Sequence, residues 1–470
     1  MTTLIKNGEI ITSSAEFRGD ILIEDEVIAA VGADLGNTAD TVIDAAGKVV
    51  FPGGVDQHTH YSALCNTGDQ DTAGYETSDS ALVGGTTTVV DYAPQDPGKG
   101  LIESAQYRID VRAKDKVCVD YALHGFITYV TDDNSGLYRD IARLSEMGIH
   151  SIKCFMAYKN SPLHVDDGVM FRVMQESKKH GITVFVHTEN GDVIDEMQRE
   201  CIARGEVAPK YHAETRPSFC EGEAAQRALY LAQQAGGTPL CIVHNTSKAV
   251  CDVIAEARGR LQPVMGETCA HYLFLDKSYL ANPDFEVASR YVLSPALRDK
   301  CEQEHLWQAL RDGTLHTIAS DHVGIGMDIK RQGLDRFDRI PNGAPGAPDR
   351  IPMLWSHGVE KGKLSRVDFV RFTATNPAKV CGLYPGKGDI APGFDADIVL
   401  YDRAWRGAVR WADNPNGADF NIYEGFEQLG RVETVLLRGK VVVEQARFVG
   451  SYGQGRFLRT RPYGACYTGL

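Results

Sequence analysis

The sequence predicts an α/β fold in which a (β/α)8 TIM barrel is joined to a small β-sandwich domain built from both termini. Three observations lead to this prediction. Residues 51–377 alternate strand-like and helix-like segments, whereas both ends of the chain are rich in short β patterns. In addition, no GxGxxG motif follows a strand and no GxxxxGK[ST] motif occurs, so the nucleotide-binding α/β folds lack their fingerprint.

Eight apolar segments of the middle region read as buried parallel strands. They are residues 55–60, 86–92, 121–129, 151–157, 183–187, 240–244, 263–268 and 315–321. Helical patterns lie between them, at residues 137–147, 170–180, 221–235, 249–257 and 303–310. Eight such repeats over more than ~250 residues fit a barrel better than an open doubly wound sheet.

The two ends carry the short alternating strands of a β domain. Residues 1–50 form one set, and residues 397–401 and 432–443 form the other. We therefore expect residues 1–50 and 378–450 to form one discontinuous β-sandwich, residues 51–377 the catalytic barrel, and residues 451–470 a C-terminal tail. Two unrelated β extensions are the alternative.

Composition excludes several classes of function. The chain of 470 residues has a net charge of −14, which argues against nucleic acid as a partner because phosphate binding needs a basic surface. No apolar run approaches the ~20 residues that span a bilayer, and the N-terminus lacks the pattern of a signal peptide. The 11 scattered cysteines, with no CxxC pair, indicate buried free thiols in a reducing cytoplasm and no zinc–thiolate site.

The first candidate site is the pair His58 and His60, at the end of the first barrel strand. Residues i and i+2 of a strand point to the same face, so both imidazoles can bind one metal ion. An HxH pair alone is weak support, because strands also carry histidines for packing. Here a Pro-Gly-Gly turn precedes the strand and more potential ligands follow at later strand ends.

Four further residues sit in or at the end of later strands: Lys153, His187, His244 and Asp321. The active sites of (β/α)8 barrels gather at the carboxyl ends of the strands, so these side chains would converge there. Each has another interpretation: the histidines could pack or cap, and Asp321 could begin a helix. Lys153 lies within apolar Ile-Lys-Cys-Phe-Met, where a buried ammonium must find an anion, become neutral or be modified.

These motifs together resemble the dihydropyrimidinase/hydantoinase (cyclic amidohydrolase) family of the amidohydrolase superfamily, over essentially the whole chain. FPGGVDQHTH is similar to the first-strand metal motif, SIKCFMAYKN to the segment with a carbamylated lysine and a tyrosine, and IASDH to the terminal aspartate. VFVHTENGD and IVHNTS resemble the two later histidine motifs. VLSPALR and RIPNGAPGAPDR resemble the two substrate-contacting loops, and YEGF and GRFLR the C-terminal segment.

The resemblance implies a centre of two divalent metal ions, for which we expect zinc. His58, His60 and Asp321 would hold the more buried ion, and His187 and His244 the more exposed one. Carbon dioxide would convert Lys153 into N6-carboxylysine, which would bridge the two ions. The carboxylate so formed would offset the charge of the two metals.

The resemblance also implies the reaction, which is the hydrolytic opening of a cyclic amide in a hydantoin, a dihydropyrimidine or a related imide or ureide. A hydroxide shared by the ions would attack, with Asp321 as general base and acid. Tyr158 would donate its hydroxyl to the oxyanion, and main-chain groups at Ser294 and Asn342 would bind the other amide of the ring. A packing role is the alternative for Tyr158.

Several segments depart from the family pattern. The loop at residues 61–69 is not apolar, Thr188 replaces an expected alanine, and Ala270-His271 replaces an expected Pro-Gln. These loops would shape the pocket around the substituent of the ring. An allantoinase-type ureide hydrolase is therefore the nearest alternative, and a non-catalytic scaffold homologue is a remote one, because all six ligand positions are occupied.

The tail and the residues before it predict assembly. Residues 423–463 place Phe426, Phe448, Phe457 and Leu458 among basic residues, a pattern that suits docking on a neighbouring subunit. The resemblance implies a homotetramer, or at least a dimer. Packing of the tail on its own barrel is the alternative.

Overall fold

Eight parallel strands of the middle segment form the barrel. The computed structural model describes residues 1–63, 72–96, 98–131 and 133–464. In spatial order, which is also chain order, the strands are β6 (Gly54–Thr59), β7 (Thr86–Pro94), β8 (Asp120–Phe126), β9 (Ser151–Phe155), β10 (Thr183–His187), β11 (Leu240–Ile242), β12 (Val264–Cys269) and β13 (Thr317–Ala319). Every predicted strand is present, and residues 183–187 coincide with β10.

Backbone and side-chain contacts complete the seam between β6 and β13, where the barrel closes. Thr59 and His322 form a parallel bridge, and the His60 amide donates to the His322 carbonyl at 2.9 Å. Asp56 accepts the Ser320 amide at 3.1 Å, and the buried Arg350 guanidinium lies 3.6 Å from the other Asp56 oxygen. The seam therefore holds the first and last strands, and with them His58, His60 and Asp321, in one register.

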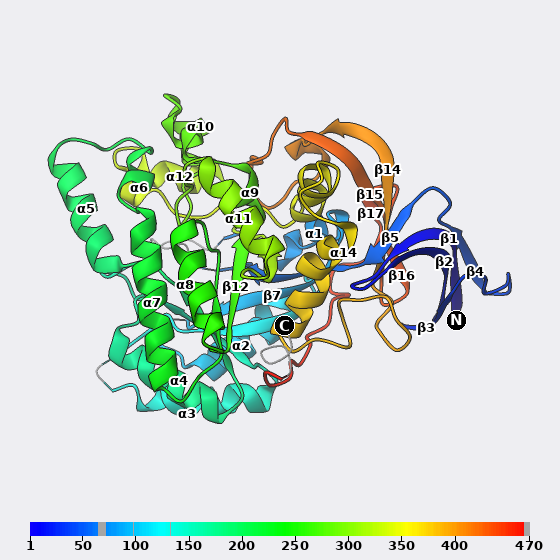
Figure 1. Cartoon of the computed structure of the whole chain (residues 1–470), viewed down its shortest axis with the longest axis horizontal. Helices are drawn as coiled ribbons and strands as arrows, with labels where there is room; N and C mark the ends of the chain where they lie inside the picture. The colour runs from blue at the N-terminus through cyan, green and yellow to red at the C-terminus, as the bar shows by residue number, and fades with distance from the viewer. Residues whose placement is uncertain (64–71, 97, 132, 465–470) are drawn as a thin grey trace.

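Helices surround the barrel, as Figure 1 shows. They are α1 (Asp79–Val83), α2 (Leu101–Tyr107), α3 (Ser135–Met147), α4 (Asp167–Lys179), α5 (Gly191–Ala203), α6 (Tyr211–Glu214), α7 (Ser218–Gln234), α8 (Lys248–Gly259), α9 (Ala270–Phe274), α10 (Phe285–Ser289), α11 (Cys301–Arg311), α12 (Met327–Lys330), α13 (Arg350–Met353), α14 (Arg366–Val370) and α15 (Asn376–Val380). Within the described ranges, none has the length and apolar character needed to cross a membrane.

Local sequence explains the predicted helices. Helix α3 buries Leu137, Ile141 and Leu144, which are three or four residues apart and so share one face. It ends at Gly148, whose φ of 80° suits glycine. Helix α4 begins where the Asp166 carboxylate accepts the Val169 amide at 2.9 Å.

The two ends of the chain form a second sheet, which lies to the right of the barrel in Figure 1. Its nine strands are β1 (Thr2–Ile11), β2 (Glu16–Glu24), β3 (Val27–Gly32), β4 (Thr41–Asp44), β5 (Val49–Pro52), β14 (Ile398–Ala408), β15 (Glu427–Leu437), β16 (Lys440–Glu444) and β17 (Arg447–Phe448). β5 pairs with β1 on one side and with β14 on the other, so the two ends share one sheet, as predicted. Ile21 of β2 and Leu436 of β15 lie in one buried cluster, which shows that the sheet curls around a common core.

The tail crosses the amino-terminal end of the barrel strands on its own chain. Tyr121 at the start of β8 bridges to Phe457, and the Thr460 amide donates to the Gly148 carbonyl at 2.7 Å. The Phe457 ring lies 5.7 Å from that of Tyr121, centroid to centroid. The described tail residues thus pack on their own barrel, which was the alternative considered from the sequence. Contact with another subunit stays a prediction.

A buried ion cluster sits under the barrel, between the tail and the second sheet. The Lys387 ammonium lies 2.7 Å from Asp120, 2.9 Å from Asp395 and 2.8 Å from Asp397. Asp120 also pairs with Arg438 and accepts the Arg456 amide at 2.9 Å. This cluster joins the barrel, the second sheet and the tail at the end opposite the strand carboxyl termini.

Candidate active site

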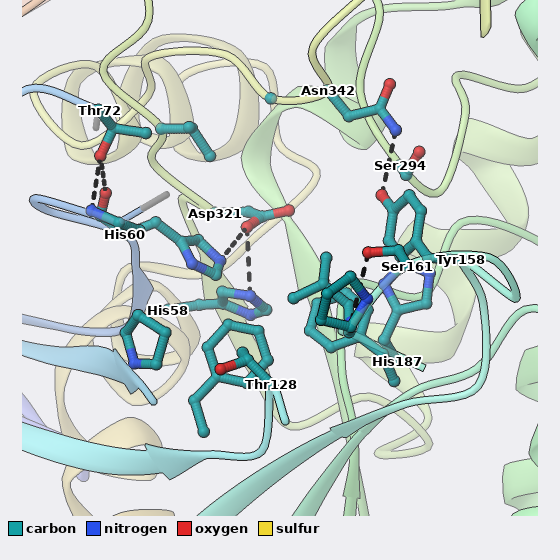
Figure 2. A pocket seen from close by; sticks show the side chains of 18 of the residues that line it. His58, His60, Thr72, Thr128, Tyr158, Ser161, His187, Ser294, Asp321 and Asn342 are labelled. Atoms are coloured by element: carbon teal, nitrogen blue, oxygen red, sulfur yellow. Dashed lines mark hydrogen bonds and ion pairs between the residues drawn. The ribbon is translucent and has the colours of Figure 1, made fainter. Parts of the chain in front are cut away.

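A pocket opens at the carboxyl ends of the barrel strands. Its wall contains all but one of the residues that the sequence singled out: His58, His60, Tyr158, His187, His244, Ser294, Asp321 and Asn342. Lys153, the remaining residue, is fully buried in β9. Figure 2 shows His58, His60 and Asp321 on one side of the pocket, and Tyr158, Ser294 and Asn342 on the other.

Asp321 lies where the first and last strands meet. Its Oδ1 is 3.2 Å from Nε2 of His58 and 3.2 Å from Nε2 of His60. Burial opposes ionisation of this carboxyl, but the two imidazoles hold the pKa of Asp321 well below its ordinary value. The aspartate is therefore ionised at neutral pH and presents an anion to the pocket.

Two buried glutamates orient histidines of the site. Glu267 of β12 lies 2.7 Å from Nδ1 of His58, and Glu189 lies 2.8 Å from Nε2 of His187. A carboxylate only accepts, so each histidine donates from the nitrogen facing its glutamate and turns the other towards the pocket. Sequence reasoning missed both glutamates, although an acidic residue inside the apolar strand at 263–268 was a usable signal.

Three of the ligand nitrogens accept no hydrogen bond in the described part of the chain. Nε2 of His58, Nδ1 of His187 and Nδ1 of His244 are buried and accept no hydrogen bond from the described residues. Burial lowers the pKa of His60 to about 4 and also lowers the pKa values of His187 and His244. The imidazoles of His60, His187 and His244 are consequently neutral, which is the form that binds metal ions. Against the effect of burial, the carboxylates of Asp321 and Glu267 raise the pKa of His58.

Lys153 completes this group. Its Nζ is buried without a hydrogen-bond partner among the described residues, 4.8 Å from the ring centroid of Tyr92 and 4.9 Å from that of Phe155. Burial lowers the pKa of Lys153 to about 8, although Asp321 and Glu267 act to raise it. A buried ammonium without acceptors is costly, and the neutral amine is correspondingly favoured.

Three residues of the pocket have backbone conformations that only glycine adopts readily. The φ angles are 59° at Tyr158, 41° at His244 and 49° at Asp321. Such strain persists where surrounding structure enforces it, and it concentrates at functional sites. The turns after β9, β11 and β13 thus aim these side chains into the pocket.

Tyr158 contacts the second of the two loops flagged in the sequence. The Asn342 side-chain amide donates to the Tyr158 hydroxyl at 3.1 Å, with Ser294 beside it in Figure 2. Burial raises the pKa of Tyr158, while the nearby Arg216 acts to lower it. The hydroxyl is therefore protonated at neutral pH and can donate to an oxyanion.

The donor set fits a divalent metal ion. The ligand atoms of His58, His244 and Asp321 lie within 4.8 Å of one another, and three imidazole nitrogens and one amine are buried without hydrogen bonds to the described residues. Imidazole nitrogen and carboxylate oxygen are common zinc ligands. Packing alone does not account for so many buried polar atoms lacking partners at one place.

One wall of the pocket is apolar. It includes Phe126, Phe155 and Leu163, which belong to one hydrophobic cluster. The loop at 61–69, which departs from the family pattern, lies outside the described residues from position 64 on. Thr72 follows it and lines the pocket, where its hydroxyl donates to the His60 carbonyl at 2.7 Å.

Comparisons with known proteins agree with this geometry. Residues 49–442 match the Amidohydrolase family. A D-hydantoinase of Ralstonia pickettii is 41% identical over 98% of this chain and 100% of its own length. A D-phenylhydantoinase of Escherichia coli O81 (strain ED1a) is 35% identical over 98% of this chain and 99% of its own. The crystal structure of dihydropyrimidinase from Brevibacillus agri NCHU1002 superposes with a TM-score of 0.94 at 39% identity, covering 99% of this chain and 100% of that one.

Proposed function

The chain belongs to the amidohydrolase family, and from this premise we propose that it opens cyclic amide rings by metal-dependent hydrolysis. It is a cyclic amidohydrolase, and hydantoins, dihydropyrimidines and related cyclic imides or ureides are its proposed substrates. The observation that carries the proposal is the cluster of buried nitrogens without hydrogen bonds, gathered around the ionised Asp321.

We assign the metal ligands as the sequence suggested. His58, His60 and Asp321 would hold one ion, and His187 and His244 would hold the other. Lys153 would bridge the two sets, because its Nζ lies against the rings of Tyr92 and Phe155, which contact the rings of His58 and His187. The imidazole and carboxylate ligands suit zinc. Two bound divalent ions lower the pKa of a water molecule towards about 7 and polarise the carbonyl under attack.

Lys153 serves this site as a carbamate. Its low pKa makes the neutral amine available, and the amine nitrogen adds to the carbon of carbon dioxide with loss of one proton. The product is N6-carboxylysine, whose negative charge replaces a positive one in the position between the two ligand sets. The apolar surroundings of Nζ favour the modification because they destabilise the ammonium.

The protein's own residues then handle the protons and the developing charge. Asp321 takes the proton of the attacking water and delivers it to the ring nitrogen as the C–N bond breaks. Tyr158 donates its hydroxyl to the carbonyl oxygen that becomes negative. Main-chain groups at Ser294 and Asn342 hold the remaining amide of the ring.

The apolar wall points to an apolar substituent on the ring. Phe126, Phe155 and Leu163 face the same pocket as the catalytic groups, and burial of a hydrophobic substituent against them favours binding. The similarity to a D-phenylhydantoinase is consistent with such substrates. We propose 5-substituted hydantoins with aromatic or branched aliphatic substituents as the preferred class.

Assembly and location follow from separate observations. We propose a homotetramer, or at least a dimer, by resemblance to the family. A cytoplasmic location is supported by the cysteines, because nine of them in the described part are free thiols and eight of these are buried. Light scattering at micromolar concentration tests the assembly, and a monomer would refute it.

A substrate panel tests the proposed function. Metal-loaded full-length protein is assayed for loss of ring absorbance with hydantoin, 5-phenylhydantoin, 5-isopropylhydantoin, dihydrouracil and allantoin. We expect ring opening with at least one hydantoin or dihydropyrimidine, and loss of activity after chelation that added zinc restores. Turnover of allantoin alone would support the ureide alternative, and turnover of no compound would contradict the proposal.

A further inference from the structure

A buried lysine outside the metal centre ties together the two loops that line the substrate side of the pocket. Lys330, the last residue of α12, has no exposed surface. Its ammonium donates to the carbonyls of Val292 at 2.8 Å, Pro341 at 2.8 Å and Gly343 at 2.7 Å. Three carbonyl acceptors match the three N–H groups of an ammonium, and the donor's charge strengthens each bond.

These carbonyls flank the two residues expected to bind the ring. Pro341 and Gly343 stand on either side of Asn342, and Val292 is two residues before Ser294. The Val292 carbonyl also accepts the Gly343 amide at 3.2 Å, so the two loops meet at the ammonium. One side chain thus sets the distance between segments that lie 48 residues apart (342 minus 294) in the sequence.

Further contacts restrict the backbone conformations of both loops. The carbonyls next to Ser294 accept from buried groups, with His212 Nε2 2.7 Å from the Leu293 oxygen and the Tyr272 hydroxyl 2.6 Å from the Pro295 oxygen. Gly343 has a φ of 123°, and a Cβ there would lie 2.7 Å from Cβ of Val323.

We propose that Lys330 is a positioning residue for substrate recognition. It holds the backbones of Ser294 and Asn342 at the spacing that receives the non-reacting amide of a cyclic imide. The Asn342 side chain, which donates to the Tyr158 hydroxyl at 3.1 Å, belongs to one of these two segments. This inference rests on the proposed function and extends it, because a rigid two-loop clamp selects a planar ring amide over an open-chain one.

Two variants of Lys330 test the proposal on metal-loaded, full-length protein. Lys330→Met removes all three donors, and Lys330→Gln retains an amide with two. We expect KM for the best cyclic substrate to rise about 10–100-fold in Lys330→Met and less in Lys330→Gln, with kcat within about fivefold of wild type and metal content unchanged. Lys387→Met, which removes a buried lysine at the opposite end of the barrel, is the matched control and should leave KM unchanged.

A second readout separates this proposal from the proposed function. Hydrogen exchange of the backbone amides of Asn342, Gly343 and Ala344 should become at least about tenfold faster in Lys330→Met and stay unchanged in Lys387→Met. If wild-type protein opens no ring, the proposed function is refuted. The exchange measurement still tests whether Lys330 holds the two loops in place. Unchanged KM and exchange in folded Lys330→Met would overturn the proposal. Failure of both Lys330 variants to fold would also overturn it, because Lys330 would then be required by the fold.

Discussion

Two buried lysines at opposite ends of the barrel have opposite surroundings. Lys387, at the amino-terminal end, lies within 3 Å of three carboxylates, and these raise its pKa despite the burial. Lys153, towards the carboxyl end, has no hydrogen-bond partner among the described residues, and burial lowers its pKa to about 8. The same side chain is thus held firmly as a cation in one place and loses its proton more readily in the other.

The contrast extends to the surroundings of each lysine. At the amino-terminal end, charges are paired and the tail covers the strands with backbone hydrogen bonds. At the pocket, several histidine nitrogens have no hydrogen-bond partner among the described residues, and Tyr158, His244 and Asp321 have positive φ angles. The paired charges at the amino-terminal end therefore stabilise the fold. The unpaired groups at the carboxyl end are available to bind ligands.

The largest expected effect is the loss of activity when Lys153 is truncated. Lys153→Ala removes the group proposed to bridge the two ions, so we expect metal content to fall below two per chain. The fall in kcat should exceed the roughly 10³-fold cost of losing one oxyanion donor. Metal analysis and steady-state kinetics measure both, and a variant with two metals and wild-type kcat would remove Lys153 from the mechanism.

A matched pair of substitutions should change stability in opposite directions in metal-free protein. At pH 7, Lys387→Met breaks a buried ion cluster and should lower the free energy of unfolding by about 3–5 kcal/mol. Lys153→Met removes an amine whose burial is unfavourable when charged, and should raise that free energy by about 3 kcal/mol. Urea denaturation in the presence of a chelator measures both, and shifts of the same sign would contradict the contrast.

Lys387 and Lys153 should change the free energy of unfolding with pH in opposite directions. The pKa of Lys387 is raised by folding, so its contribution is complete below the unfolded value of about 10.4 and is lost as pH rises through the folded pKa. The pKa of Lys153 is lowered to about 8 by folding, so its cost is complete below about pH 8. That cost disappears between about pH 8 and 10.4, and the advantage of Lys153→Met should therefore shrink over this interval.

A further prediction concerns Tyr158. Tyr158→Phe removes only the hydroxyl and should leave fold and metal content unchanged. Loss of one oxyanion donor costs about 10²–10³ in kcat. Retention of nearly full kcat would contradict a catalytic role, and a rise in KM alone would make Tyr158 a binding residue.

The sequence was sufficient for the barrel and for placing the candidate ligands at strand ends because both follow local patterns. Buried parallel strands read as short apolar runs, and side chains at their carboxyl ends meet whatever the loops do. That rule placed His58, His187 and Asp321 in one pocket without any knowledge of contacts.

Other features depend on contacts between distant segments and could not be predicted in this way. Lys330 lies in a polar stretch, and its partners are carbonyl groups, which leave no trace in a sequence. The hydrogen bond that His187 donates to Glu189 likewise depends on the turn after β10. The aromatic residues of the tail suggested docking on a neighbouring subunit, which stays a prediction, and they do not specify that Phe457 packs on Tyr121 of its own barrel.

The carbamate at Lys153 is the most direct test of the account. Metal-free protein is reconstituted with zinc in ¹³C-bicarbonate, and the carbon spectrum is recorded for wild type, Lys153→Ala and Lys387→Met. We predict one carbamate signal per chain and two zinc ions in wild type and in Lys387→Met, and no carbamate signal in Lys153→Ala. A fully active wild-type enzyme that holds two zinc ions without a carbamate signal would contradict the account.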